Sequence, residues 1–128
     1  MTVRGIAEIV LWVHDMAKAR QFYEGVLGLQ PLAERENPRF LRVGDPAIAV
    51  PQLLVLVQMP SQEPFQKPRT LHHLALEIPA EEFDAEHARL TGLGFQVRSG
   101  QHPVIPSRTM YVDDPEGNEV ELICASPS

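Results

Sequence analysis

The sequence is poor in several features that define whole classes of protein. It contains one cysteine, Cys124, so an intrachain disulfide is excluded and a reducing compartment is favoured; we expect a cytoplasmic protein. The longest apolar runs, 9–13 and 47–57, are far shorter than the roughly 20 residues of a membrane helix. No charged and apolar leader with a cleavage pattern is visible. We therefore expect no membrane partner.

Basic residues are also scarce. Lys and Arg number 11 against 17 Asp and Glu, the net charge is −6, and no basic run is interleaved with aromatic residues. This balance argues against nucleic acid as a partner. Hydrophobic residues make up 44% of the 128 positions, which is enough for the core of one domain of ordinary size.

What the sequence does contain is a weak internal repeat. Its halves share an alternating strand pattern, a Leu-Gly turn after a helical segment, and an Asp-Pro before a closing strand. The matched segments are Glu8–Val13 with His73–Ile78, Leu27–Pro31 with Leu93–Val97, and Gly44–Leu54 with Asp113–Ile123. Their offsets grow from 65 (73 minus 8) to 69 (113 minus 44), which indicates small insertions in the second half.

Each half predicts a strand, a helix and three further strands, and the strand after the second helix is expected at Phe95–Arg98. The first helix follows Asp15, a good N-cap, and is expected to end before Gly28, where the chain can turn. We predict an α+β fold of two tandem β-α-β-β-β modules whose curved sheet surrounds a shared cavity. Module one covers 4–59, a proline-rich linker covers 60–69, and module two covers 70–126.

Side-chain alternation along the strands selects the residues that face the cavity. Leu11 and Val13 form the apolar set of the first strand, so Glu8, Val10 and Trp12 are expected on the concave face. The same rule sends His73 and Glu121 to the concave face of the second module. One imidazole and two carboxylates suit a divalent cation such as Mn, Fe(II), Ni, Co or Zn. The alternative is that these are ordinary surface groups of strand ends.

Three stretches of the chain carry a family resemblance. "EIVLWVHDMAKARQFYEGVLGLQ" (8–30) resembles the opening of the vicinal oxygen chelate superfamily, which includes glyoxalase I, bleomycin-resistance proteins, fosfomycin-resistance enzymes and extradiol dioxygenases. "HHLALEI" (72–78) is similar to the start of its second module, and "YVDDPEGNEVELI" (111–123) to its closing hairpin. The resemblance covers essentially the whole chain and implies a glyoxalase-like fold.

The resemblance also implies site residues. It places metal ligands at Glu8, His73 and Glu121, with Glu8 or Glu121 available as the general base. Glu8 departs from the His found at this place in the dioxygenases and fosfomycin enzymes, which disfavours an extradiol dioxygenase. Counting from the shared Asp-Pro makes Gln52 (121 minus 69) a candidate fourth ligand, whereas counting from the strand-ending prolines gives Leu54. Trp12, Gln52 and Tyr111 are the expected substrate-pocket residues.

Two functions follow from the resemblance. The first is a metal-dependent lyase, isomerase or dioxygenase that binds a small oxygenated substrate through oxygens on the metal. The second is a metal-free protein of the bleomycin-resistance kind that sequesters a small molecule. In both cases the resemblance implies a homodimer.

Overall fold

The computed structural model describes residues 1–44, 50–66 and 70–126. The chain forms two compact units, Met1–Pro64 and Phe65–Ser128. The division falls inside the segment predicted as the linker, 60–69, of which residues 67–69 lie outside the described part of the chain.

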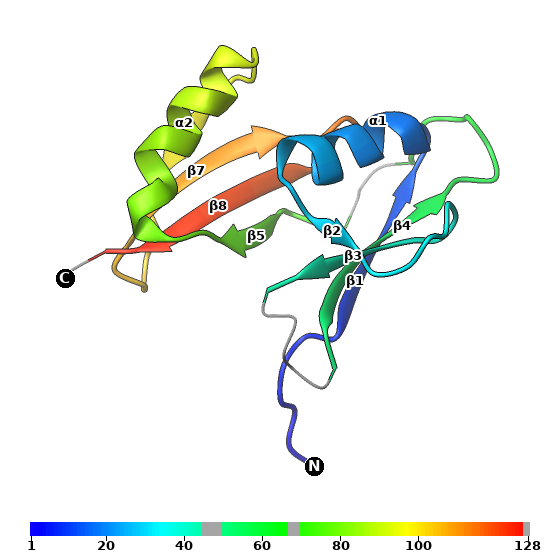
Figure 1. The fold of residues 1–128 in the computed structure, drawn as a ribbon, viewed down its shortest axis with the longest axis horizontal. Coiled ribbons are helices and arrows are strands. Elements are labelled where there is room, and N and C mark those ends of the chain that lie inside the picture. The colour runs from blue at the N-terminus through cyan, green and yellow to red at the C-terminus, as the bar shows by residue number, and fades with distance from the viewer. Residues whose placement is uncertain (45–49, 67–69, 127–128) are drawn as a thin grey trace. The chain divides into compact units, whose positions relative to one another are not determined.

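Unit 1 is a four-stranded sheet with one helix (Figure 1). The strand order is β1-β4-β3-β2, in which β1 runs parallel to β4 and the other neighbours are antiparallel. Its elements are β1 (Glu8–Val13), α1 (Met16–Arg20), the π-helical η1 (Gln21–Val26), β2 (Gln30–Pro31), β3 (Arg39–Val43) and β4 (Gln52–Gln58).

Unit 2 repeats this topology. The order is β5-β8-β7-β6, again with a parallel first pair and antiparallel neighbours. Its elements are β5 (Leu74–Glu77), the 3₁₀ turn η2 (Ala80–Glu82), α2 (Phe83–Gly92), β6 (Arg98–Gly100), β7 (Ser107–Asp113) and β8 (Glu119–Ala125). The repeat read from the sequence is thus a structural repeat, and the predicted α+β fold class is confirmed.

The predicted limits of the first helix are confirmed by its capping contacts. The Asp15 carboxylate accepts a hydrogen bond from the Lys18 amide at 3.0 Å, which satisfies one of the free amides of the first turn. Gly28 adopts a φ of 76°, in the left-handed region that favours glycine, and the chain then leaves the helix. The helical segment therefore begins after Asp15 and ends before Gly28, as the sequence predicts.

One predicted strand lies three residues further along than expected. We expected Phe95–Arg98, but β6 begins at Arg98. The Phe95 amide donates to the carbonyl of Leu90, and the Gly94 amide donates to that of Thr91. Because these bonds close the C-terminus of α2, Phe95 belongs to the helix cap and is not available for strand pairing.

The core of each unit lies between its sheet and its helix. In unit 1 Leu11 and Val13 are buried together with Ala19, Phe22 and Tyr23 of the helical segment. Alternate residues of β1 are exposed, as the strand pattern predicted. In unit 2 the equivalent core includes Leu74, Phe83, Leu90, Met110, Val112, Val120, Leu122 and Cys124.

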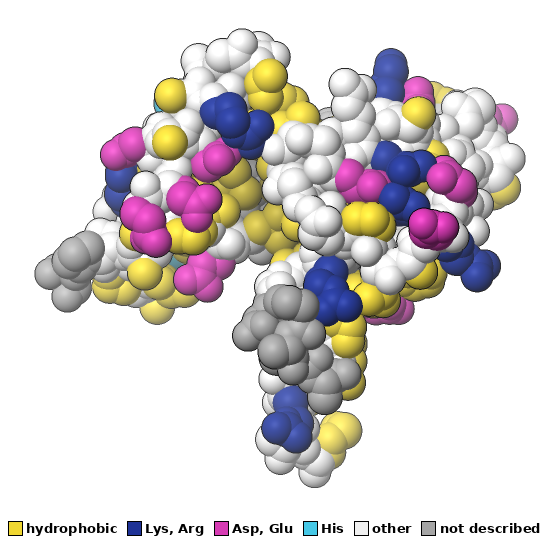
Figure 2. All heavy atoms as spheres, viewed as in Figure 1, with side chains coloured by type: hydrophobic (Ala, Val, Ile, Leu, Met, Phe, Trp, Pro, Cys, Tyr) yellow, Lys and Arg dark blue, Asp and Glu magenta, His cyan; other side chains and the backbone are white. Residues whose placement is uncertain are grey.

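A buried ion pair joins the helix of unit 1 to its sheet. Arg39 of β3 is only 6% exposed and donates from Nε and Nη2 to the two carboxylate oxygens of Glu24, at 3.0 and 2.8 Å. Arg20 also donates to Glu24 and, on the surface, to Glu36. In Figure 2 acidic and basic side chains lie side by side over this helix. The bidentate geometry is the strong form of a charged hydrogen bond.

No helix among the described residues is both long and apolar enough to cross a bilayer.

Candidate metal centre

A capped turn positions the last strand of unit 2. The buried Asp114 carboxylate accepts hydrogen bonds from the amides of Glu116 and Asn118 and from the Asn118 side chain, at 2.8 to 2.9 Å. Gly117 has a φ of 84°, which suits its glycine. The turn brings Asp113 into register with Glu119. The Asp-Pro-Glu-Gly-Asn sequence therefore fixes which side chains of β8 face each side of the sheet.

Strand register places a row of chemically active side chains on the sheet face opposite α2. Glu121 of β8 lies opposite Ala75 of β5 and opposite Tyr111 of β7, which in turn lies opposite Arg98 of β6. Directly paired residues project from the same face of a sheet. The intervening residues of β8, which include Val120, are buried toward the helix. The register therefore places Glu121 on the face of the sheet away from α2.

His73 and Glu121 lie in contact on this face. His73 immediately precedes β5, and its Nε2 is 3.1 Å from Oε1 of Glu121. The Glu121 side chain is 4% exposed, whereas that of His73 is 34% exposed. The other carboxylate oxygen of Glu121, Oε2, is buried and has no hydrogen-bond partner among the described residues. A buried unpartnered carboxylate oxygen is costly, so a positively charged ligand at this position would be stabilising.

The pair has the chemistry and spacing of two metal ligands. Two ligand atoms held about 2.1 Å from a cation at right angles lie about 3.0 Å apart, close to the observed nitrogen–oxygen separation. An imidazole nitrogen and a carboxylate oxygen are both ordinary ligands of Zn, Fe, Co, Ni and Mn. The residues of unit 2 therefore fit a divalent cation.

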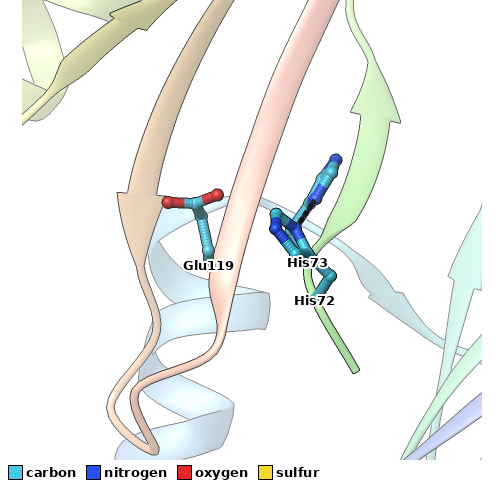
Figure 3. Close-up of side chains that lie close together, drawn as sticks. All are labelled: His72, His73 and Glu119. Atoms are coloured by element: carbon cyan, nitrogen blue, oxygen red, sulfur yellow. Dashed lines mark hydrogen bonds between the residues drawn. The ribbon is translucent and has the colours of Figure 1, made fainter. Parts of the chain in front are cut away.

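A second grouping involves the neighbouring histidine. One ligand atom each from His72, His73 and Glu119 lie within 4.8 Å of one another (Figure 3). Nδ1 of His72 and Nδ1 of His73 are 2.7 Å apart and hydrogen-bonded, as the dashed line in Figure 3 marks. Two nitrogens on one tetrahedral cation would lie about 3.3 Å apart. The short separation therefore favours a hydrogen bond over joint coordination by these two nitrogens.

Glu119 already forms an ion pair with an arginine side chain. Its Oε2 accepts from Nη2 of Arg98 at 3.1 Å, and the same nitrogen donates to Asp113 at 2.7 Å. The Asp113 carboxylate, followed by that of Glu119, raises the pKa of the Arg98 guanidinium above its usual value. Arg98 thus neutralises part of the negative charge at this end of β8, and no ion pair between Glu121 and an arginine forms among the described residues.

Tyr111, a predicted pocket residue, lies beside His73. The ring centroids of Tyr111 and His73 are 6.1 Å apart and the planes are nearly perpendicular, at 78°. A Cβ placed on Gly100 would lie 2.2 Å from Cε2 of Tyr111. The tyrosine ring therefore occupies space that is free because residue 100 of β6 is glycine. It supplies an aromatic edge next to the candidate ligands.

Glu8 and Trp12, the predicted site residues of unit 1, project from one face of β1. Glu8 and Trp12 are exposed, as is Val10 between them, while Leu11 and Val13 are buried toward the helix. Glu8 pairs with Leu53 of β4 and is at the start of its strand. Its carboxylate is available to a ligand because it lies on the open face of unit 1.

Gln52 does not share that face. Glu8 is in register with Leu53, and side chains alternate between the two faces of β4. Gln52 therefore lies on the same face as Leu54 and Leu56, which are buried toward the helix. The repeat also supplies a different equivalent for Glu121. Ile9 pairs with Leu54 as Leu74 pairs with Val120, so the residue of β4 that matches Glu121 is Val55. An apolar Val55 cannot supply a fourth ligand, and neither Gln52 nor Leu54 occupies that place.

The sequence did not single out His72 as a residue of the candidate site. The His-His doublet was visible, but the sequence could not show that the two Nδ1 atoms face each other.

The chain is similar to known proteins of one superfamily. The family model described as the Glyoxalase/Bleomycin resistance protein/Dioxygenase superfamily matches residues 5–122. Catechol-2,3-dioxygenase of Bacillus subtilis (strain 168) is 29% identical over 120 residues, which are 91% of this chain but 40% of the dioxygenase. Metallothiol transferase FosB of Lysinibacillus sphaericus (strain C3-41) is 29% identical over 123 residues, covering 95% of this chain and 83% of that protein.

Solved structures give the same fold. A glyoxalase/dioxygenase from Nostoc punctiforme is 25% identical with a TM-score of 0.74, over 97% of this chain and 92% of that one. TnmS3, an antibiotic binding protein from Streptomyces sp. CB03234, is 26% identical with a TM-score of 0.67, over 98% and 99% of the two chains. The chain spans less than half the length of the dioxygenase that it matches.

Proposed function

Because the chain belongs to the glyoxalase/bleomycin resistance protein/dioxygenase superfamily, we propose that it is a divalent-metal-dependent enzyme acting on a small oxygenated organic substrate. The reaction class is that of a lyase, an isomerase or a dioxygenase, with the first two favoured by the carboxylate at position 8. The observation that carries the proposal is the contact between His73 and Glu121, whose second carboxylate oxygen is buried without a partner.

The proposed ligands are Glu8, His73 and Glu121. A bound divalent cation supplies Lewis acidity to substrate oxygens. Glu121 is buried on β8, so its neighbours restrict its rotamers and its carboxylate is suited to hold the cation in a fixed position. His73 is partly exposed and can meet both the cation and the substrate. Glu8, which is exposed on β1, is proposed as the third ligand on the family resemblance.

The two carboxylates are assigned different tasks. Acid–base chemistry needs a group that exchanges protons with water or substrate, and the exposed Glu8 meets this requirement better than the buried Glu121. We therefore assign the role of general base to the Glu8 carboxylate and the coordination of the cation to Glu121. Tyr111, beside His73 in unit 2, and Trp12, 54% exposed in unit 1, are each proposed to offer an aromatic surface to the substrate.

The experiment is metal identification followed by substrate profiling. Protein purified without chelators is analysed for bound metal, and the metal-free protein is then loaded with Mn, Fe(II), Co, Ni or Zn. We expect one cation per chain, and turnover of an oxygenated substrate that depends on it. Protein that holds no metal and takes up none at micromolar concentrations would contradict the proposal.

A second candidate function has one specific observation in its favour. TnmS3 is an antibiotic binding protein of similar fold, and Ile6, Val10 and Trp12 expose apolar surface in unit 1. On this alternative the protein sequesters a small molecule without a metal. Saturable ligand binding that persists in excess chelator, together with no metal uptake, distinguishes it. A homodimer and a cytoplasmic location are proposed for either function; sedimentation velocity tests the first.

A further inference from the structure

When both rings are neutral, the hydrogen bond between His72 and His73 has only one arrangement of protons that satisfies both ends. Two Nδ1 atoms 2.7 Å apart must share one proton, because two lone pairs or two N–H groups would repel. On its other side, Nε2 of His73 lies 3.1 Å from Oε1 of Glu121. A carboxylate oxygen is an acceptor, so in the metal-free protein the proton is on Nε2 of His73. It follows that His73 accepts at Nδ1 and that His72 donates from Nδ1.

A cation held by Nε2 of His73 requires the opposite arrangement. The lone pair of Nε2 must then be free, so a neutral His73 carries its proton on Nδ1. His72 must in turn present the lone pair of its own Nδ1 and carry its proton on Nε2. Around this pair, Glu121 is the other proposed ligand, and Arg98 is held by Asp113 and Glu119.

We infer that His72 is a positioning residue for the metal ligand His73, acting as the hydrogen-bond acceptor that stabilises its metal-binding tautomer. Ligand histidines are generally oriented by a partner on their second ring nitrogen, and here that partner is an adjacent imidazole. The inference rests on the proposed function, because it assigns the metal to His73.

The proton balance of the exchange closes. His73 releases its Nε2 proton to solvent and takes the Nδ1 proton of His72. His72 takes one proton from solvent on Nε2. Both rings remain neutral, and the pair holds two protons before and after. His72 can exchange this proton with solvent, because the residue is exposed to water.

The test combines nitrogen NMR with metal titration. Long-range proton–nitrogen spectra of the wild-type protein, recorded without and with Zn, report the tautomer of each histidine ring. We expect His72 to change from the Nδ1–H to the Nε2–H form when the metal is added, while His73 changes from Nε2–H to Nδ1–H. A purely structural role for His72 would leave its tautomer unchanged, and that result would overturn the inference.

The affinity of His72 variants for Zn is the second measurement. His72→Ala is expected to weaken Zn binding about tenfold, the lower end for loss of a partner to a ligand histidine, because His72 is exposed. His72→Asn, whose side-chain oxygen can accept from Nδ1 of His73, is expected to recover part of the loss. His87→Ala is the matched control, since His87 lies on α2, the helix on the other face of the sheet.

The outcomes separate the two proposals. Wild-type protein that binds no cation refutes the proposed function, and the inference falls with it. Wild-type protein that binds Zn while His72→Ala binds equally well refutes the inference alone and leaves the proposed function standing.

Discussion

The ion pair between Glu24 and Arg39 leads to a quantitative prediction for the substitution Glu24→Gln. Removing one partner of a fully buried pair costs about 3–5 kcal/mol, because the remaining charge is left uncompensated. Two features reduce this value: the Glu24 side chain is 18% exposed, and Arg39 also donates to the carbonyl of Arg35. We therefore expect a loss of about 2–3 kcal/mol in the free energy of unfolding, about 6–10 °C in Tm for a chain of this length.

The matched control is Glu36→Gln. Glu36 pairs with Arg20 through a short 2.6 Å contact, but its side chain is 76% exposed. An exposed pair of this kind contributes about 0–1 kcal/mol. Urea unfolding followed by circular dichroism measures both variants. Equal losses for the two would refute the claim that burial, and not the number of ion pairs, sets the contribution of this contact.

The pH dependence of the same pair has a definite sign. The hydrogen bond from Arg39, opposed by burial and reinforced by Arg20, lowers the pKa of Glu24 below its ordinary value of 4.5. Arg39 remains charged throughout, since Glu24 raises its pKa. The stabilisation is therefore complete above pH 4.5 and is lost as the pH falls through the lower folded-state pKa. We expect the difference between wild type and Glu24→Gln to shrink on acidification below pH 4.5. A constant difference down to pH 2 would contradict this.

Three further substitutions test the second unit. Gly100→Ala should displace the Tyr111 ring and lower stability by about 1–3 kcal/mol, measured by urea unfolding and by the chemical shifts of Tyr111; unaltered shifts would count against the packing described. Thr109→Val removes a buried hydroxyl that has no partner in the described part of the chain, so we expect a change within about 1 kcal/mol or a slight gain in thermal stability; a loss above 2 kcal/mol would contradict this. Asp114→Ala deletes the acceptor of three hydrogen bonds at the β7–β8 turn and should cost about 2–4 kcal/mol; retention of full stability would show that the turn does not depend on it.

The sequence predicted the parts of the fold that depend on local periodicity. Alternation along β1 placed Glu8 and Trp12 on the face away from the helix, and the Asp15 cap and Gly28 set the helix limits. Both signals are local, since they depend on backbone geometry that one residue or one turn determines.

What the sequence could not supply were the contacts that depend on register. Gln52 was aligned with Glu121 by counting residues across loops, and an insertion of one or a few residues shifts such a count. Strand pairing instead matches Val55 with Glu121. Likewise, the contact between Arg39 of β3 and Glu24 on the helical segment joins residues far apart in the chain, which local sequence patterns do not show.

The proposed metal site is tested most directly by titrating Zn and Mn into the metal-free protein and its variants under identical conditions. We expect wild type and His87→Ala to bind one cation per chain with the same affinity. His73→Ala and Glu121→Gln should lose at least a hundredfold in affinity, because each removes one proposed ligand. Wild type without measurable binding, or a His73→Ala variant that binds as well as wild type, would contradict the assignment of the cation to His73 and Glu121.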